Sequence, residues 1–120
     1  MGKRGISVAK YKTGDIIIMD FSPTKGHEQD GRRPAMVVSV SELEDKTGMV
    51  WAVPITSATD KFPTHFSLEA KEGKVTGTVL CEHLKSFDSD ARNCRKVDEA
   101  TEESIMKCKK IIDAIVYIPK

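Results

Sequence analysis

Cysteine is scarce in this chain, and its three cysteines follow no recognisable spacing. Cys81, Cys94 and Cys108 are odd in number and contain no CxxC pair. A disulfide framework and a zinc knuckle are both disfavoured by this pattern. We expect two or all three of the thiols to be small buried side chains of a protein that works in a reducing cytoplasm.

Net charge and long apolar runs are also lacking. The formal net charge is +1 although 31% of the residues are charged. Bulk charge therefore does not indicate broad binding to duplex nucleic acid, and any polyanion would have to be held by a local group of Lys and Arg. No apolar run approaches the length that spans a membrane, and residues 1–14 lack the apolar core of a signal peptide. We expect a cytoplasmic protein without membrane contact.

Histidine is the third scarce residue type. His27, His65 and His83 lie too far apart, without cysteine or carboxylate spacing, to form a zinc motif. We expect no metal site and no cofactor, and we interpret His65 as a packing or sheet-edge residue.

Most of the sequence has the residue pattern that is typical of β-strands. β-branched and alternating segments predict strands at residues 15–21, 35–40, 49–55, 64–68, 75–85 and 94–97, and residues 41–46 suit a helical turn. From Thr101 the apolar spacing becomes helical, with Thr101 as the N-cap. The sequence predicts a mainly β fold, a small barrel-like sheet with a C-terminal helix, in which residues 1–13 form a basic leader and residues 14–120 a single domain.

One loop between two predicted strands gathers unusual chemistry. Residues 22–34 read SPTKGHEQDGRRP, which is too long and too charged for a tight hairpin. Long charged loops held by rigid strands are common places for function. On local pattern alone, an ordinary solvated loop is an equally good interpretation.

Several motifs give the chain a family resemblance. The segment from Gly14 to Val38, which contains that loop, resembles the opening of the MazF/PemK/Kid toxins. Further matches are VPITS at 53–57, PTH at 63–65, VLCEHLKSFD at 79–88 and the terminal helix. The loop together with the downstream PITS element is specific, whereas either alone would be weak.

The resemblance implies both a fold and an activity. The fold is a small SH3-like β-barrel of the CcdB/PemK/MazF type with a C-terminal helix, and the assembly is a homodimer. The activity is that of a type II toxin–antitoxin toxin: a metal-independent, sequence-specific endoribonuclease that cuts single-stranded mRNA. The 2′-hydroxyl attacks its own phosphate and leaves 2′,3′-cyclic phosphate and 5′-hydroxyl ends. A cognate antitoxin of the MazE type is implied, with a C-terminal tail that covers the RNA groove.

The resemblance also carries catalytic roles onto this chain. It implies Arg33 and Thr56 as the main catalytic pair, with Glu82 at a carboxylate position that serves as base in Kid-like members and His27 as a helper. A guanidinium stays protonated, so Arg33 suits donation to phosphate oxygens better than the role of base. In Kid-like members an Arg precedes the carboxylate by two residues, whereas this chain has Leu80 there.

The remaining site residues are assigned to RNA contacts, and each has a structural alternative. The RNA-binding candidates are Lys25, Glu28, Gln29, Ser57, His83 and Lys85, of which His83 is also an auxiliary acid–base candidate. Arg33 could instead be a surface ion-pair partner, and the hydroxyls of Thr56 and Ser57 could serve only a turn. Phe62 is the aromatic residue we most expect at the surface, whereas Trp51 suits packing.

Fold alone does not settle function, so two alternatives stay open. A CcdB-like gyrase poison shares the barrel, and a non-catalytic SH3-like binding module would need neither Arg33 nor Thr56. The end of the helix, IVYIPK at 115–120, lacks the gyrase-binding terminus of CcdB. The presence of both catalytic residues favours the ribonuclease.

Overall fold

A mainly β fold with a C-terminal helix is what the computed structural model shows, over residues 9–21, 31–58 and 62–117. The elements are β1 (Asp15–Asp20), β2 (Arg32–Val37), α1 (Ser41–Thr47), β3 (Met49–Thr56), β4 (His65–Ser67), β5 (Thr78–Leu80), the 3₁₀ turn η1 (Cys81–His83), β6 (Lys85–Asp88), β7 (Arg95–Glu99) and α2 (Glu102–Val116). The architecture predicted from the sequence is therefore confirmed. No helix in these ranges is both long and apolar enough to span a bilayer.

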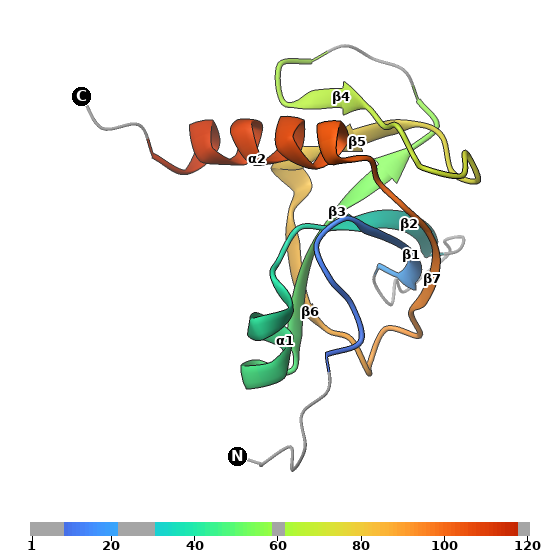
Figure 1. The fold of residues 1–120 in the computed structure, drawn as a ribbon, viewed down its shortest axis with the longest axis vertical. Helices are drawn as coiled ribbons and strands as arrows, with labels where there is room; N and C mark the ends of the chain where they lie inside the picture. Colours follow the sequence, from blue (N-terminus) through green and yellow to red (C-terminus); the bar gives the residue numbers. More distant parts are fainter. Residues whose placement is uncertain (1–8, 22–30, 59–61, 118–120) are drawn as a thin grey trace.

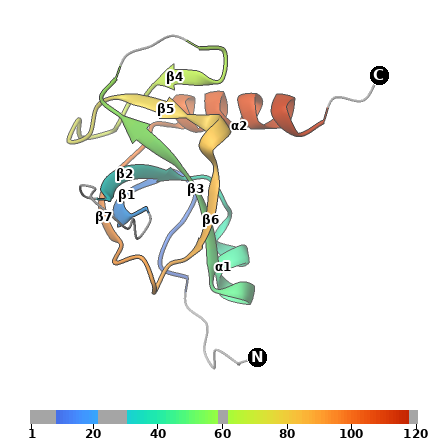
Figure 2. The same cartoon turned by 180° about the vertical axis from the view of Figure 1, so that it is seen from behind.

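Strand β3 is the centre of an antiparallel sheet. The strand order is β4-β5-β3-β2-β1-β7, and β6 also pairs with β3. The first part of β3 pairs with β6, its middle part pairs with β2, and its last two residues pair with β5. Helix α2 lies across the end of the sheet near β5, and α1 lies at the opposite end (Figures 1 and 2). This curved sheet is compatible with the small barrel expected from the sequence.

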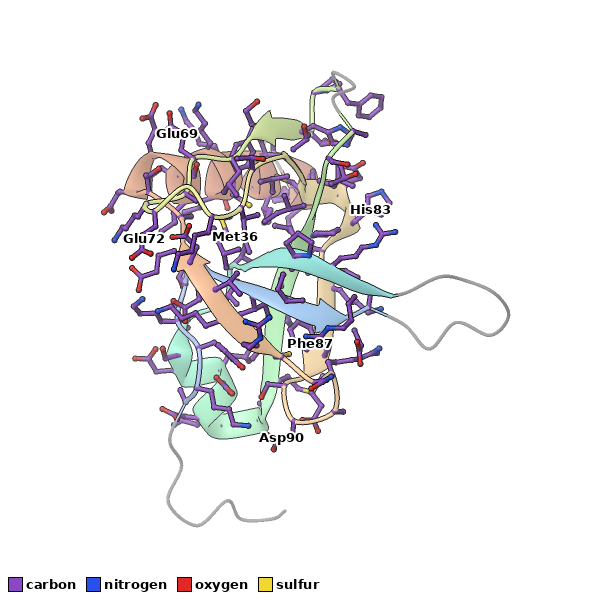
Figure 3. The ribbon with its side chains drawn as sticks, turned by 90° about the vertical axis from the view of Figure 1, so that its right-hand side faces the viewer. Met36, Glu69, Glu72, His83, Phe87 and Asp90 are labelled. Atoms are coloured by element: carbon purple, nitrogen blue, oxygen red, sulfur yellow. The ribbon has the colours of Figure 1, made fainter. Side chains whose placement is uncertain are left out.

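Alternating side chains place an apolar core on each face of the sheet. Ile16 belongs to the cluster under α2 together with Met36 and Cys108, whereas its neighbour Ile17 belongs to the second cluster with Phe87. Met36 and Phe87 are labelled in Figure 3. Because both clusters are completely buried, the sheet is a rigid platform on which the ends of the strands can hold functional groups.

Two of the three cysteines are core residues, which agrees with the prediction from the sequence. Cys81 and Cys108 are 1% exposed, with their sulfur atoms 3.7 Å apart. The hydrogen bond to Cys108, together with burial, raises the pKa of the Cys81 thiol. Cys94 is half-buried, and burial raises the pKa of its thiol to about 11. Cys81 and Cys94 therefore stay as unreactive thiols at neutral pH.

The predicted extended run at residues 75–85 is wrong in its centre. The chain is extended only at β5 and β6, and η1 interrupts it between them. Cys81 donates its backbone N–H to the Thr64 carbonyl and buries its side chain in the core. The helical turn then exposes both Glu82 and His83. In a continuous strand one of these two neighbours would have faced inwards.

Strand β2 also differs from its predicted bounds. It begins at Arg32 rather than at residue 35, and it ends at Val37. Pro34 lies inside it, opposite Ile18 of β1. A proline usually marks the start of a strand because it has no N–H to donate, so the pattern placed the start too late.

The last residues of the predicted leader are attached to helix α1 and to the segment that precedes it. The backbone N–H groups of Lys10 and Tyr11 both donate to Oε1 of Glu44 at 3.0 Å, and Thr13 Oγ1 donates to the Ser39 carbonyl at 2.7 Å. Glu44 is 1% exposed, so this attachment is a buried one. Residues 10–13 are thus not loose. The leader stays a prediction for residues 1–8, which lie outside the described residues.

Candidate active site

The C-terminal end of β3 brings together the two residues that the sequence analysis ranks first. The β2–β3 register ends at the buried pair Ala35 and Pro54, and Thr56 pairs with Thr78 of β5. Arg33 precedes Ala35 by two residues, and Thr56 follows Pro54 by two. Residues two apart on a strand share a face, so Arg33 and Thr56 lie at the same end and on the same face of this strand pair.

The adjacent arginines of β2 have different surroundings. Arg32 Nη1 donates to Oδ1 of Asp20 at 3.1 Å and to the Asn93 carbonyl at 2.9 Å. Arg33 is exposed, and its side chain makes no hydrogen bond or ion pair with another residue in the described ranges. A surface ion pair, the structural alternative raised for Arg33, is present at its neighbour Arg32. The Arg33 guanidinium is available for an anionic ligand.

Thr56 is held in place by a local turn and by a glycine. Its Oγ1 accepts a hydrogen bond from the Ala58 N–H at 3.2 Å, which leaves the hydroxyl hydrogen free to be donated. Gly77, with φ of +145°, packs directly on this residue: a Cβ there would lie 2.4 Å from the Thr56 carbonyl oxygen. The turn role proposed as an alternative is real, and it is compatible with a donor role. Ser57 is exposed beside it.

An open cavity of about 390 Å³ adjoins Thr56. We call it the polar cavity, because hydroxyl, imidazole and carboxylate groups lie around its wall. It is lined by Thr56, Ala58, Phe62, His65, Leu80, Glu82 and His83. His83 lies on the side of the molecule at which β1 ends and β2 begins (Figure 3).

Glu82 is the fixed carboxylate of the polar cavity. Thr64 Oγ1 donates to its Oε1 at 2.6 Å, and His65 Nε2 lies 2.8 Å from its Oε2. Burial acts to raise the pKa of this carboxyl, but the hydrogen bonds from Thr64 and His65 outweigh it and lower the pKa to about 2. A carboxylate that holds a proton so weakly is a poor base, so the role of base expected for Glu82 is weakened. Its negative charge is permanent near neutral pH.

His65 is the site residue that the sequence analysis missed. It does lie on the edge strand β4, as expected, but its ring lines the polar cavity and binds Glu82. The ring also packs on Phe62, with centroids 5.2 Å apart. The β4–β5 register, which pairs His65 with Leu80, brings it close to Glu82. Only a prediction that β4 pairs with β5 could have indicated from the sequence that His65 lies near Glu82.

His83 and Lys85 complete the described part of the predicted RNA-binding set. The His83 side chain is 60% exposed, with Nε2 3.5 Å from Oε2 of Glu82. Lys85 begins β6, opposite Ala52 of β3, and is half-buried. Four predicted residues, Lys25, His27, Glu28 and Gln29, lie outside the described residues.

The exposed aromatic residues differ in part from the expectation. Phe62 is 57% exposed at the rim of the polar cavity, as predicted. Tyr117 is more exposed, at 71%, so Phe62 does not rank first. Trp51 is 44% exposed rather than fully packed. Phe62 is the exposed aromatic ring that lies beside Thr56.

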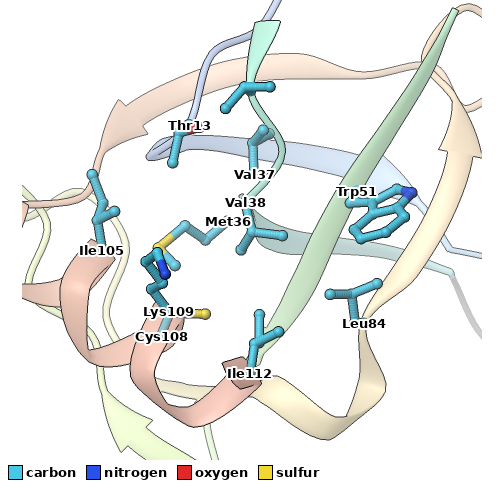
Figure 4. A pocket seen from close by; sticks show the side chains of 11 residues that line it. Thr13, Met36, Val37, Val38, Trp51, Leu84, Ile105, Cys108, Lys109 and Ile112 are labelled. Atoms are coloured by element: carbon cyan, nitrogen blue, oxygen red, sulfur yellow. The ribbon is translucent and has the colours of Figure 1, made fainter. Parts of the chain in front are cut away.

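A second cavity, of about 270 Å³, lies between α2 and the sheet. We call it the apolar cavity, because its wall is almost entirely hydrocarbon apart from Thr13 and Lys109. Trp51 and Leu84 lie on one side of it, and Ile105 and Cys108 of α2 lie on the other (Figure 4). It lacks the carboxylate and imidazole groups that the polar cavity offers. The polar cavity is therefore the candidate active site.

No group of three or more His, Cys, Asp or Glu side chains within residues 9–21, 31–58 and 62–117 is arranged to hold a metal ion. The chemical groups that the polar cavity does offer are a hydroxyl, an anchored carboxylate and an exposed imidazole, and Arg33 supplies a guanidinium at the same end of the β2–β3 pair. Such a set suits binding of a phosphate and transfer of a proton.

Comparison with known proteins identifies the family. Residues 12–116 match the family described as PemK-like, MazF-like toxin of type II toxin-antitoxin system. The chain is 36% identical over 103 residues to the endoribonuclease toxin MazF of Escherichia coli K12, covering 86% of this chain and 91% of that one. It is 32% identical over 117 residues to the endoribonuclease toxin ChpB of the same strain, covering 90% and 99%.

Solved structures agree with this result. The crystal structure of MazF from Deinococcus radiodurans superimposes with a TM-score of 0.77 at 32% identity, covering 88% of this chain and 96% of that one. The MazF chain of a MazE-MazF crystal structure from the same organism gives 0.79 at 32% identity, covering 88% and 95%. The family resemblance found in the sequence is confirmed, and the chain belongs to the PemK-like, MazF-like toxins of type II toxin–antitoxin systems.

Proposed function

We propose that this protein is the toxin of a type II toxin–antitoxin system and a sequence-specific, metal-independent endoribonuclease that cleaves single-stranded mRNA. One observation carries the proposal: Arg33 of β2, whose side chain has no partner among the described residues, and Thr56 of β3 lie at the same end of this strand pair, where Thr56 lines an open polar cavity. The relatives named above are endoribonuclease toxins, which supports the same activity here. Family membership and site chemistry therefore point to one reaction.

The reaction is an attack of the RNA 2′-hydroxyl on the adjacent phosphate. It passes through a phosphorane whose charge needs donors, and it yields a 2′,3′-cyclic phosphate and a 5′-hydroxyl end. Arg33 donates to the non-bridging phosphate oxygens, for which its fork of N–H groups is suited. Thr56 donates its free hydroxyl hydrogen to the same group. Both residues thus act by binding the transition state.

RNA contacts extend from this centre along the cavity. Phe62 offers a ring on which an unstacked base can lie. Ser57, His83 and Lys85 surround the same end of the sheet and contact the RNA backbone. The loop residues Lys25, His27, Glu28 and Gln29 remain proposed contributors, His27 to catalysis and the other three to binding.

The proposed partners follow from the family. A Deinococcus radiodurans relative was crystallised with MazE, which supports a cognate antitoxin for this chain, with a C-terminal tail that covers the RNA groove. We propose a homodimer in the cytoplasm. Exposed apolar side chains on α2 suit association with another chain, and they include Met106, Ile115 and Val116.

The direct test is cleavage of a long single-stranded RNA by the purified protein in excess EDTA, with sequencing of the cut ends. The proposal requires discrete cuts that share a short sequence, and Arg33→Ala should remove them without affecting folding. A folded wild-type protein that behaves like Arg33→Ala and cuts nothing would contradict the proposal. A gyrase poison or a binding module without catalysis would then be the better explanation.

A further inference from the structure

The ribonuclease reaction needs a group that removes a proton from the 2′-hydroxyl, and the obvious carboxylate is unsuited to it. Glu82 accepts hydrogen bonds from Thr64 at 2.6 Å and from His65 at 2.8 Å. These bonds stabilise the ionised carboxylate, so it is a weak proton acceptor. Glu82 has instead the position and the constant charge of a residue that orients another group.

His65 is also unsuited to exchange a proton with RNA. Its Nε2 faces Glu82, and its ring packs on Phe62. The side chain is only 9% exposed. An imidazole enclosed in this way supports Glu82, as a second partner next to Thr64.

His83 is the exposed imidazole of the polar cavity. Its side chain is 60% exposed and its Nε2 lies 3.5 Å from Oε2 of Glu82, the oxygen that also faces His65. Strand β6 pairs with β3, and the pair nearest to the C-terminal end of β3 is Lys85 with Ala52. The turn η1, which carries His83, precedes β6 in the sequence and therefore lies nearer to that end of β3. His83 therefore lies in the same cavity wall as Thr56.

We propose that His83 is the proton-transfer residue of the ribonuclease, oriented by a Glu82 carboxylate that Thr64 and His65 hold in place. This inference rests on the proposed function. The arrangement is a carboxylate–histidine pair in which the carboxylate favours the charged ring that forms during the reaction. Of the charged and titratable groups that line the polar cavity with His83, Glu82 lies on η1 and His65 on β4, and Lys85 on β6 follows His83 by two residues.

The step balances as follows. His83 takes the proton of the 2′-hydroxyl while O2′ forms a bond to phosphorus and the bond from phosphorus to O5′ breaks. The leaving O5′ takes a proton from water of the open cavity. The imidazolium then returns its proton to the hydroxide so formed, and the cycle ends without net gain or loss of protons.

The test uses the full-length protein and an oligoribonucleotide that carries a mapped wild-type cut site. Single-turnover rates are measured from pH 5 to pH 9 in EDTA for wild type, His83→Gln, His65→Gln and the control Asp113→Asn. Asp113 lies on the exposed face of α2, where it pairs with Lys109, so its loss should leave the rate unchanged. Binding is measured with the same oligonucleotide carrying a 2′-O-methyl group at the cut.

We expect His83→Gln to lower the rate about 100- to 10,000-fold, with binding of the 2′-O-methyl RNA kept within about twofold. The acid limb of its pH–rate profile should disappear. In a further variant, His83→Ala, imidazole in solution should restore part of the rate, because the site is open. His65→Gln should give an intermediate loss without abolishing the acid limb.

Two results would overturn the inference, and they are distinguishable. If wild type cuts the RNA and His83→Gln cuts it at a similar rate with the same acid limb, His83 does not transfer the proton, although the ribonuclease stands. If wild type leaves all RNA intact while it folds normally, the proposed function fails and this inference fails with it.

Discussion

The two adjacent arginines at the start of β2 have different roles, one structural and one proposed to be catalytic. Successive residues of a strand point to opposite faces, so Arg32 and Arg33 cannot share a partner on one face. Arg32 is committed to Asp20 and to the Asn93 carbonyl. Arg33 makes no such contact with the described residues. Substitution of one arginine therefore serves as the control for substitution of the other.

We expect Arg33→Ala to lower the cleavage rate by at least about 100-fold, because a donor to the phosphorane is lost. Its melting temperature should equal that of wild type. Arg32→Ala should do the reverse: it should cost about 1 kcal/mol of unfolding free energy and leave most activity in place. Urea melts and initial cleavage rates measure both quantities. If Arg32→Ala instead lowered the cleavage rate and Arg33→Ala instead lowered the unfolding free energy, the roles assigned to the two arginines would be wrong.

The acid stability of the protein should depend on Glu82. Its folded pKa of about 2 lies below the ordinary value for glutamate, about 4.3. The stabilisation of the fold by the ionised Glu82 carboxylate is therefore fully present above about pH 4.3 and is lost as pH falls towards 2. We expect Glu82→Gln to melt lower than wild type at pH 7 and to approach it near pH 2 in a series of thermal melts. Curves that stay parallel over this range would show that Glu82 is not stabilised in its charged form.

At the residue level, the sequence motifs identified the site only in part. Arg33, Thr56 and Glu82 follow from the family motifs, and all three lie at the end of β3 or beside it. The contact between His65 and Glu82 could not be predicted, because it depends on the β4–β5 register and on the turn at Cys81–His83. No local pattern encodes that pairing.

At the level of elements, the position of Thr56 depends on how closely β5 approaches β3. Gly77, which precedes β5, has a φ of +145°, and a Cβ at this position would lie 2.4 Å from the Thr56 carbonyl oxygen. We expect Gly77→Ala to destabilise the fold by about 1–3 kcal/mol and to lower the cleavage rate as Thr56 is displaced. Chemical denaturation and single-turnover rates measure the two effects.

Gly73 is the matched control for this substitution. It also has a positive φ, +67°, but a Cβ there would meet nothing within 4 Å. Gly73→Ala should therefore cost only the local backbone strain, about 1 kcal/mol, with an unchanged cleavage rate. Equal losses of activity in the two variants would show that close packing on Thr56 is unimportant.

The loop at residues 71–74 is fixed by one buried carboxylate from β7. Asp98, 5% exposed, accepts hydrogen bonds from the backbone N–H groups of Glu72, Lys74 and Glu99. Burial acts to raise its pKa, but these three donors outweigh burial and lower it. Its stabilising effect is thus present above about pH 4 and declines at lower pH.

Asp98→Asn tests this anchor. At pH 7 we expect a loss of about 1–3 kcal/mol, because an N–H of the new amide would face a backbone N–H. The difference from wild type should shrink as pH falls below about 4. Urea denaturation at pH 7 and pH 3 provides the comparison. A cost that is the same at both values would mean that the charge of Asp98 does not matter.

The elements themselves were predictable wherever one local rule decided them. Helix α2 begins where the sequence indicates, with the Thr101 hydroxyl accepting from the Ser104 N–H at 3.2 Å. The β-branched runs of β1 and β3 were also recognised. The start of β2 and the turn η1 were not, because Pro34 and Cys81 are placed by pairing partners that are distant in the sequence.

For the whole molecule, the arrangement separates stability from chemistry. One apolar cluster lies under α2 and the other on the opposite face of the sheet, whereas the polar groups of the proposed site lie where β3 ends and neighbouring strands begin or turn. Segments from β2, β3, β4 and η1 must be brought together before the site exists. The sequence motifs therefore form the proposed catalytic site only when the whole chain is folded.

The most direct test of this account is the chemistry of the cut. A single-stranded RNA with one mapped site would be compared with the same RNA carrying one 2′-deoxynucleotide on the 5′ side of the scissile phosphate, both in EDTA. The account predicts that the first is cut to a 2′,3′-cyclic phosphate and a 5′-hydroxyl end, and that the second stays intact. Cleavage of the deoxy-substituted RNA, or a 5′-phosphate end, would contradict attack by the 2′-hydroxyl and the mechanism proposed here.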